Sequence, residues 1–251
     1  MNDSVKNDMA TTSPREGTWA TPVDRFKVAG VSDQAINLNV DGRRPEGPLQ
    51  GFGQLWQKTY RVRLSGSNVS PQQVIQTWKE NFGKFWSPGN NFYGSLTGIA
   101  PGQVAVLNLA GPGGMPLSTG VRVIYADDES FSFMTPQGHM YAAFITFSAY
   151  DDDGTTVVQV QPLLRASDPI YEIGMRIGYA DKIEDEFWHA TLINIAKHFN
   201  VQGQVTQQTA CIDPRWQWKY AGNIWNNAAI RTALYTPVRL VKRLLRSKQA
   251  S

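Results

Sequence analysis

The chain has 251 residues, of which 41% are hydrophobic, enough to build one substantial domain with appendages or two small ones. A single cysteine, Cys211, excludes an intramolecular disulfide framework, and no stretch approaches the roughly 18 consecutive apolar residues of a membrane span. The formal charge of +3 is unevenly spread, since residues 215–251 hold eight Lys or Arg and no Asp or Glu. Because the first residues also lack the apolar core of a signal peptide, we expect a cytoplasmic protein, peripheral to the inner face of a membrane if its basic end binds lipid.

The ordered domain is expected to begin after a polar N-terminus. Residues 1–53 are rich in Asp, Asn, Gly, Pro and Ser, which predicts a partly disordered extension. Apolar and polar residues then alternate over residues 55–64, with Trp56 and Tyr60 on the apolar side. This period of two predicts a strand with one buried face.

An amphipathic helix and a series of strands follow. Ser70 before Pro71 is typical of a helix start, and apolar residues recur at helical spacing from there to Phe85. Turn-forming pairs such as Pro-Gly and Asp-Gly then separate stretches of strand-like sequence. These stretches are residues 103–109, 120–125, 130–134, 140–150 and 155–164. The pattern predicts strands linked by hairpins.

A second, longer helix is predicted after the strands. Asp168 and Pro169 repeat the cap-and-proline signal, and the helical pattern runs to about Asn200, unless a kink at Gly174 or Gly178 shortens it. We expect one apolar stripe along this helix, facing the sheet. Its members are Ile173, Ile177, Ala180, Phe187, Thr191 and Ile195.

Motifs that usually mark cofactor or metal sites stand in the wrong context. Residues 111–116 are rich in glycine but lead into a strand, whereas a phosphate-binding loop must open a helix. Residues 151–155 resemble the start of a calcium loop, but their glycine is at the wrong position and a hairpin turn explains them better. The Glu-x-x-His of residues 186–189 lacks the second copy that a di-metal site needs. We therefore predict no cofactor and no metal.

The element order and two stretches resemble a known superfamily. Residues 138–147, Gly-His-Met-Tyr-Ala-Ala-Phe-Ile-Thr-Phe, and the helix 181–196 are similar in pattern to the START-like, polyketide cyclase and ligand-binding (SRPBCC) superfamily, over about residues 54–200. The resemblance implies an α+β helix-grip fold, in which a curved antiparallel sheet of about six to seven strands wraps a long C-terminal helix. It also implies a hydrophobic cavity between sheet and helix, used in different members for lipid, hormone or polyketide binding and sometimes for cyclisation or hydroxylation.

On this basis the chain divides into an N-terminal extension (1–53), a helix-grip domain (54–201) and a basic helical tail (202–251). The predicted function is the binding of a hydrophobic small molecule or lipid, as a carrier or sensor. A polyketide cyclase-like enzyme is the competing class, with His139, Tyr141 and Tyr60 as its candidate catalytic groups. No catalytic motif is recognisable, so binding is favoured over catalysis.

Candidate ligand-binding residues are mostly aromatic and lie on the predicted strands and long helix. His139 is either a titratable ring facing the cavity or, as we favour, a hydrogen-bonded histidine at a hairpin edge. The predicted ligand-binding residues are Tyr60, Phe92, Tyr93, Tyr125, Phe133, His139, Tyr141, Ala143, Phe147, Ile173, Ile177 and Phe187.

The tail combines tryptophan with basic charge. A helix is predicted over residues 223–235, and Thr236-Pro237 is expected to cap a final one with Val241 and Leu245 on its apolar side. That final helix either packs on the domain, which we favour, or binds an anionic membrane surface as a peripheral adaptor would. Nucleic acid is a weaker third partner, because the rest of the chain is acidic. The membrane-surface candidates are Trp225, Arg239, Lys242, Arg243 and Arg246.

Overall fold

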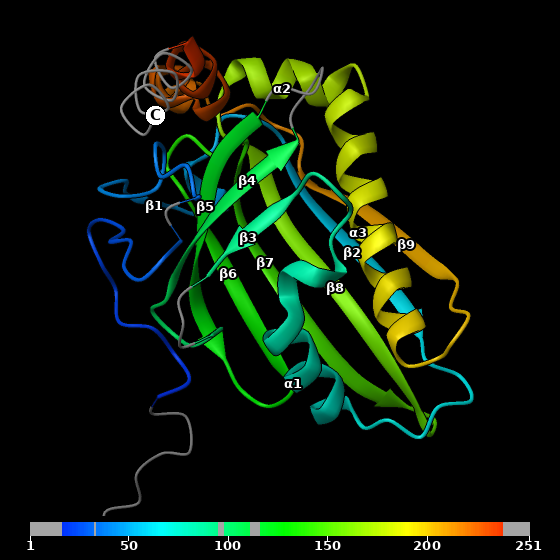
Figure 1. Cartoon of the computed structure of the whole chain (residues 1–251). Helices are drawn as coiled ribbons and strands as arrows, with labels where there is room; N and C mark the ends of the chain where they lie inside the picture. Colours follow the sequence, from blue (N-terminus) through cyan, green and yellow to red (C-terminus); the bar gives the residue numbers. More distant parts are fainter. Residues whose placement is uncertain (1–16, 33, 95–97, 111–115, 238–251) are drawn as a thin grey trace, which may run out of the picture.

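A computed structural model describes residues 17–32, 34–94, 98–110 and 116–237 (Figure 1). Its centre is a curved antiparallel sheet in which the strands lie in the order β3-β4-β5-β6-β7-β8-β2-β9, with β1 paired to β6. The strands are β1 (Pro45–Glu46), β2 (Leu55–Arg63), β3 (Asn91–Tyr93), β4 (Val104–Ala110), β5 (Pro116–Ala126), β6 (Ser130–Pro136), β7 (Tyr141–Asp152), β8 (Thr155–Ala166) and β9 (Val205–Asp213). β2, the first strand predicted along the chain, pairs with β8, the last one predicted, so these two strands are neighbours in the sheet.

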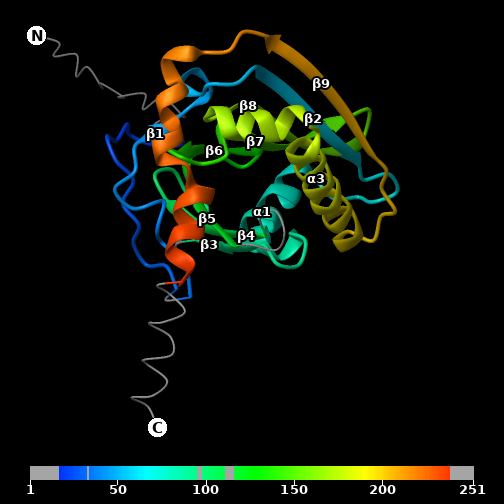
Figure 2. The same ribbon diagram turned by 90° about the horizontal axis from the view of Figure 1, so that it is seen from above.

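Two helical segments lie on the concave face of this sheet (Figures 1 and 2). The first is α1 (Pro71–Asn81), continued by the 3-10 turn η2 (Phe82–Phe85), and the second is α3 (Tyr179–His198). As predicted, Ser70 caps α1: its hydroxyl accepts the amide of Gln73, whose side chain accepts the amide of Ser70. The prediction of a helix-grip fold is confirmed.

The predicted long helix is broken at Gly178, one of the two kink positions expected. There the backbone takes a left-handed φ of 75°, which glycine adopts without strain and which ends α2 (Pro169–Arg176) before α3 begins. The prediction of one continuous apolar stripe was wrong, because α2, which precedes the break, packs on β7 and β8 through Met175 and Tyr171 and leaves Ile173 and Ile177 on its outer side. Ile173 and Ile177 are 62% and 74% exposed, whereas Ile195 is buried in the core.

Three strands were not predicted. β1 and β3 are only two and three residues long, too short to display a period. β9 is longer, but nearly all of its residues are exposed, so no buried face imposes an alternating pattern. Its position is set by backbone pairing with β2, which makes residues 205–213 of the tail the edge strand of the sheet.

The N-terminal segment and the tail both pack on the sheet. Residues 17–32 and 34–53 run over the convex face, where Phe26 and Val40 contact Val104 and Val106 in a second apolar cluster. In the tail, η4 (Trp218–Asn226) and a helix over residues 228–237 meet at Asn227, whose side chain caps that helix. The prediction of one helix over 223–235 was therefore wrong, and Thr236 lies inside a helix rather than capping one.

The predicted final helix, with its membrane-surface candidates Arg239, Lys242, Arg243 and Arg246, lies outside the described residues. Among the helices that are described, none has the length and apolar character needed to cross a bilayer.

Candidate functional site

Aromatic side chains fill the space between the concave face of the sheet and the helical segment formed by α1 and η2. Phe131 and Phe133 come from β6 and Phe147 from β7, all three on the concave face, and Trp78 comes from α1. Phe82, at the start of η2, lies at the centre of the cluster. Its ring centroid is 5.0 to 6.3 Å from those of Trp78, Trp86, Phe92, Phe131, Phe133 and Phe147.

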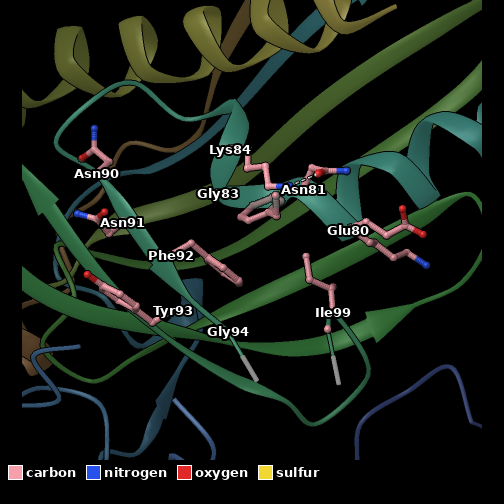
Figure 3. Close-up of a pocket in the computed structure, with 13 residues that line it drawn as sticks. Glu80, Asn81, Gly83, Lys84, Asn90, Asn91, Phe92, Tyr93, Gly94 and Ile99 are labelled. Atoms are coloured by element: carbon pink, nitrogen blue, oxygen red, sulfur yellow. Dashed lines mark hydrogen bonds between the residues drawn. The ribbon is translucent and has the colours of Figure 1, made fainter. Parts of the chain in front are cut away.

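A pocket of about 350 Å³ opens beside this cluster, between η2 and β3 (Figure 3). Phe82 and Phe92 form its apolar side, with ring centroids 5.0 Å apart in an edge-to-face arrangement, and Ile99 adds an aliphatic side chain. Lys79 and Lys84 are among the polar residues of its wall. The pocket thus joins the aromatic interior to solvent, and its volume is within the range of small-molecule sites, roughly 300 to 1,000 Å³.

A buried ionic cluster joins the sheet to the start of α3. Lys58 of β2 is only 3% exposed, and its Nζ donates to Asp181, Glu184 and Asp185 at 3.1, 3.0 and 2.9 Å. The Oη of Tyr60, two residues along the same face of β2, donates to Asp185 at 2.6 Å. The carboxylates stand at positions i, i+3 and i+4 of α3, so they share one side of the helix and converge on one cation.

Burial dominates the protonation of this cluster. It raises the pKa of Glu184 to about 7, with Lys58 opposing the shift and the neighbouring Asp181 and Asp185 adding to it. Burial disfavours a charge on Lys58 too, but the surrounding carboxylates outweigh it and raise the pKa of Lys58 above its ordinary value. Burial and the same carboxylates raise the pKa of Tyr60 and of Tyr141. With three carboxyls facing one cation, a proton on Glu184 relieves part of the excess negative charge.

A second buried carboxyl lies where the N-terminal segment meets the tail. Glu46 of β1 is buried and accepts a hydrogen bond from the amide of Asn223 at 2.8 Å. Burial raises the pKa of Glu46 to about 8, and the nearby Asp168 adds to the shift. Asp168 itself caps α2 and accepts from Asn227 at 2.8 Å. These contacts hold the tail on the sheet and do not line the pocket.

Seven of the twelve predicted ligand-binding residues lie in or against the apolar clusters on the concave face of the sheet. Phe133, Phe147 and Phe187 belong to the aromatic interior or pack against it, and Phe92 lines the pocket as well. Tyr60 lies in that interior and in the ionic cluster. Tyr141 and Ala143 form a smaller apolar cluster with Leu164, Ala166 and Met175, beside the start of α3.

The remaining candidates lie elsewhere. Tyr125 contacts Trp19, with ring centroids 4.6 Å apart, and its hydroxyl donates to Asp127. Tyr93 lines the pocket edge but packs against the convex-face cluster that contains Phe26. His139 is tied to the backbone of Tyr141 at 3.0 to 3.1 Å, and burial lowers its pKa to about 4, which matches the hydrogen-bonded alternative. Ile173 and Ile177 are exposed on and after α2.

Sequence reasoning missed Lys58 and Phe82. Lys58 stands between Trp56 and Tyr60 on the even-numbered, buried side of β2, and period two alone was sufficient to place its charge inside. A charge there needs partners, and the closely spaced Asp181, Glu184 and Asp185 were the matching signal in the sequence. Phe82 was recognised as part of the helical pattern, but its central place in the aromatic cluster depends on which strands meet it.

Solved structures with similar folds were found, although no protein-family model matches the sequence and no curated protein is significantly similar to it. Protein Ms6760 from Mycobacterium smegmatis is 12% identical, with 68% of this chain and 98% of that chain covered and a TM-score of 0.41. The di-domain ARO/CYC StfQ from the steffimycin biosynthetic pathway is 10% identical, with 58% and 50% covered and a TM-score of 0.45. The Aha1 dimer from Colwellia psychrerythraea is 14% identical, with 58% and 97% covered and a TM-score of 0.38.

At these identities and scores the likenesses say nothing about ligand or activity. The order of elements, with one long helix closing a curved antiparallel sheet, decides the fold. It is a helix-grip fold. In this chain the helix that closes the sheet, α3, is fixed to it by ion pairs at its start and by aromatic and aliphatic contacts further along.

Proposed function

We propose that the protein binds an apolar small molecule in the pocket between η2 and β3. The observation that carries the proposal is the pocket itself, about 350 Å³ in volume and bounded by Phe82 and Phe92. Aromatic walls favour flat apolar ligands, because such rings stack or meet edge to face. The protein would act as a carrier or sensor of such a molecule.

The rings behind the pocket support this proposal. Phe92 stacks on Phe133 with a centroid distance of 6.4 Å, and Phe82 contacts Phe147 at 5.1 Å. A ligand in the pocket would therefore rest against an aromatic wall that continues into the interior of the protein. Lys79 and Lys84 at the wall suit a ligand whose exposed end carries an acidic or hydroxyl group.

The position of the shifted titratable groups favours binding over catalysis. Glu184, Tyr60 and Tyr141 belong to the cluster at the start of α3, and none of them lines the described pocket. A general acid or base must lie within hydrogen-bond reach of the reacting group. A ligand held in the pocket against Phe82 and Phe92 would not meet that condition.

Fluorescence titration with 1-aminoanthracene, a flat apolar probe, tests the proposal. Ile99→Trp fills the pocket and should weaken saturable binding more than tenfold, and Phe92→Ala should weaken it several-fold by removing one aromatic wall. Thr206→Trp on β9, at the opposite edge of the sheet, is the matched control and should bind as the wild type does. Unchanged affinity in both pocket variants, with folding verified by circular dichroism, would refute this site.

A further inference from the structure

α2 and the helical part of the tail lie at the same end of the molecule (Figure 1), and several large apolar side chains of these elements are exposed. Three, Ile170, Ile173 and Ile177, lie on α2 and at its C-terminus, 45%, 62% and 74% exposed. The other four are at least 40% exposed and come from η4 and the helix 228–237. They are Trp218, Trp225, Ile230 and Leu234.

Specific contacts hold the tail beside α2, so these side chains belong to one end of the fold. The Nε1 of Trp216 donates to Glu172 of α2 at 2.9 Å, and the backbone amide of Ala229 donates to the hydroxyl of Tyr171 at 3.0 Å. The guanidinium of Arg176 lies 4.9 Å from the centre of the Trp216 ring. The exposed side chains on α2 and on the tail therefore keep a fixed relation to one another. For the rest of this subsection, Ile170, Ile173, Ile177, Trp218, Trp225, Ile230 and Leu234 are called the apolar end.

We propose that the apolar end docks on an anionic phospholipid surface. Charge supports a lipid partner, since residues 214–237 include Lys219, Arg231 and Arg215, which pairs with Asp213 of β9, and no Asp or Glu. The chain continues from this end for 14 more residues, 238–251, which add five Lys or Arg and again no acid. Cations next to an anionic surface contribute about 1 kcal/mol each, and exposed tryptophan favours the headgroup level of a bilayer.

The geometry fits a surface rather than a spanning contact. Trp225 is 85% exposed, and it follows a tail segment that is already fixed to the body of the protein. Isoleucine and leucine side chains at this end can enter the acyl boundary while the cations stay among the headgroups. The pocket between η2 and β3 is not part of the apolar end, so the two proposals fail independently.

Sedimentation with phosphatidylcholine vesicles, with and without about 30% phosphatidylglycerol, tests this docking. Binding should need the anionic lipid and should fall more than tenfold when NaCl rises from about 0.05 M to about 0.5 M, because salt screens the attraction. The variant Ile173→Ser, Ile177→Ser, Trp225→Ser should bind at least tenfold more weakly with an unchanged melting temperature, since these side chains are exposed. Tyr150→Ser, exposed at the far end of β7, is the matched control and should bind normally.

Charge reversal gives a second, separate arm. Arg239→Glu, Lys242→Glu, Arg243→Glu and Arg246→Glu combined should abolish binding to the anionic vesicles and leave 1-aminoanthracene titration unchanged. Absence of vesicle binding, equal binding to neutral vesicles, or full binding by the serine variant would each overturn the proposal. So would a dimer in light scattering that the serine substitutions dissociate without any vesicle binding, because the apolar end would then be a contact between two copies of the chain.

Discussion

The start of α3 and the rest of the helix contact one sheet through opposite chemistry. At the start, Asp181, Glu184 and Asp185 surround the buried Lys58 of β2, whereas further along Leu192 and Ile195 are buried among apolar side chains. Apolar contacts stabilise at any pH, but a buried ion pair must first repay the cost of removing its charges from water. The comparison indicates that the apolar half supplies stability, while the ionic half fixes where the helix lies and responds to pH.

The largest effect is expected in the apolar core, to which both Phe82 and the later part of α3 belong. Phe82→Ala removes a ring that contacts six aromatic neighbours and should lower the free energy of unfolding by about 3 to 5 kcal/mol. Urea unfolding measures this loss, which should be the same at pH 5 and pH 8 because no charge is involved. Tyr150→Ala, a partly exposed aromatic on β7, should cost far less. A loss below ~1 kcal/mol for Phe82→Ala would show that the cluster is not closely packed.

Removal of the buried cation, Lys58, should destabilise the ionic contact between β2 and the start of α3. Lys58→Met leaves the buried carboxyl of Glu184 without its cation and should cost about 3 kcal/mol near pH 8. In the folded protein the pKa of Glu184 is raised to about 7. The stability that the protonated carboxyl contributes is therefore fully present at acid pH and is lost as the pH rises through that value. The penalty of Lys58→Met should therefore be smaller at pH 5, where Glu184 is protonated.

A double variant separates charge from packing at this cluster. Glu184→Gln added to Lys58→Met keeps the shape of the carboxyl and removes its charge, so it should recover a large part of the stability lost at pH 8. No recovery would mean that Lys58 acts through the packing of its aliphatic chain.

A smaller effect is expected from Glu46, far from both halves of α3. The folded pKa of Glu46 is raised to about 8, so ionisation of this carboxyl should lower the stability of the wild type as the pH rises toward 9. Glu46→Gln keeps an oxygen for the amide of Asn223 and should remove up to about 2 kcal/mol of this loss. Thermal melts from pH 5 to pH 9 measure the slope, with the exposed Glu80→Gln as control. Parallel slopes in both variants would contradict a raised pKa at Glu46.

The sequence was sufficient for the elements that bury one face. β2, α1, β4 to β8 and α3 carry a clear period of two or of 3.6, and their order indicated the helix-grip fold. β9 was not predicted, because an exposed edge strand is positioned by backbone hydrogen bonds, which any side chain allows. The exposure of Ile173 and Ile177 was not predicted, because a single glycine, Gly178, changes the direction of the chain without changing the apolar pattern.

The candidate site was less predictable than the fold. Periodicity placed Phe133 and Phe147 on the concave face, but it could not tell a filled interior from an open one, because that depends on how rings from different elements meet. The pocket lies between η2 and β3, which are four and three residues long. β3 is too short to leave a period in the sequence, and η2 continues the helical pattern of α1, so the gap between them emerges only from the folded chain.

Methyl NMR of isoleucine-labelled protein, titrated with 1-aminoanthracene, tests the central claim most directly. Ile99 lines the pocket, whereas Ile173 and Ile177 lie on the exposed surface at α2, so the three methyl signals report on different places. Binding in the pocket predicts a large, saturable shift of the Ile99 methyl signal, with those of Ile173 and Ile177 unchanged. Saturable shifts at Ile173 and Ile177 with an unmoved Ile99 signal would contradict it, because the probe would then bind the surface and not the pocket between η2 and β3.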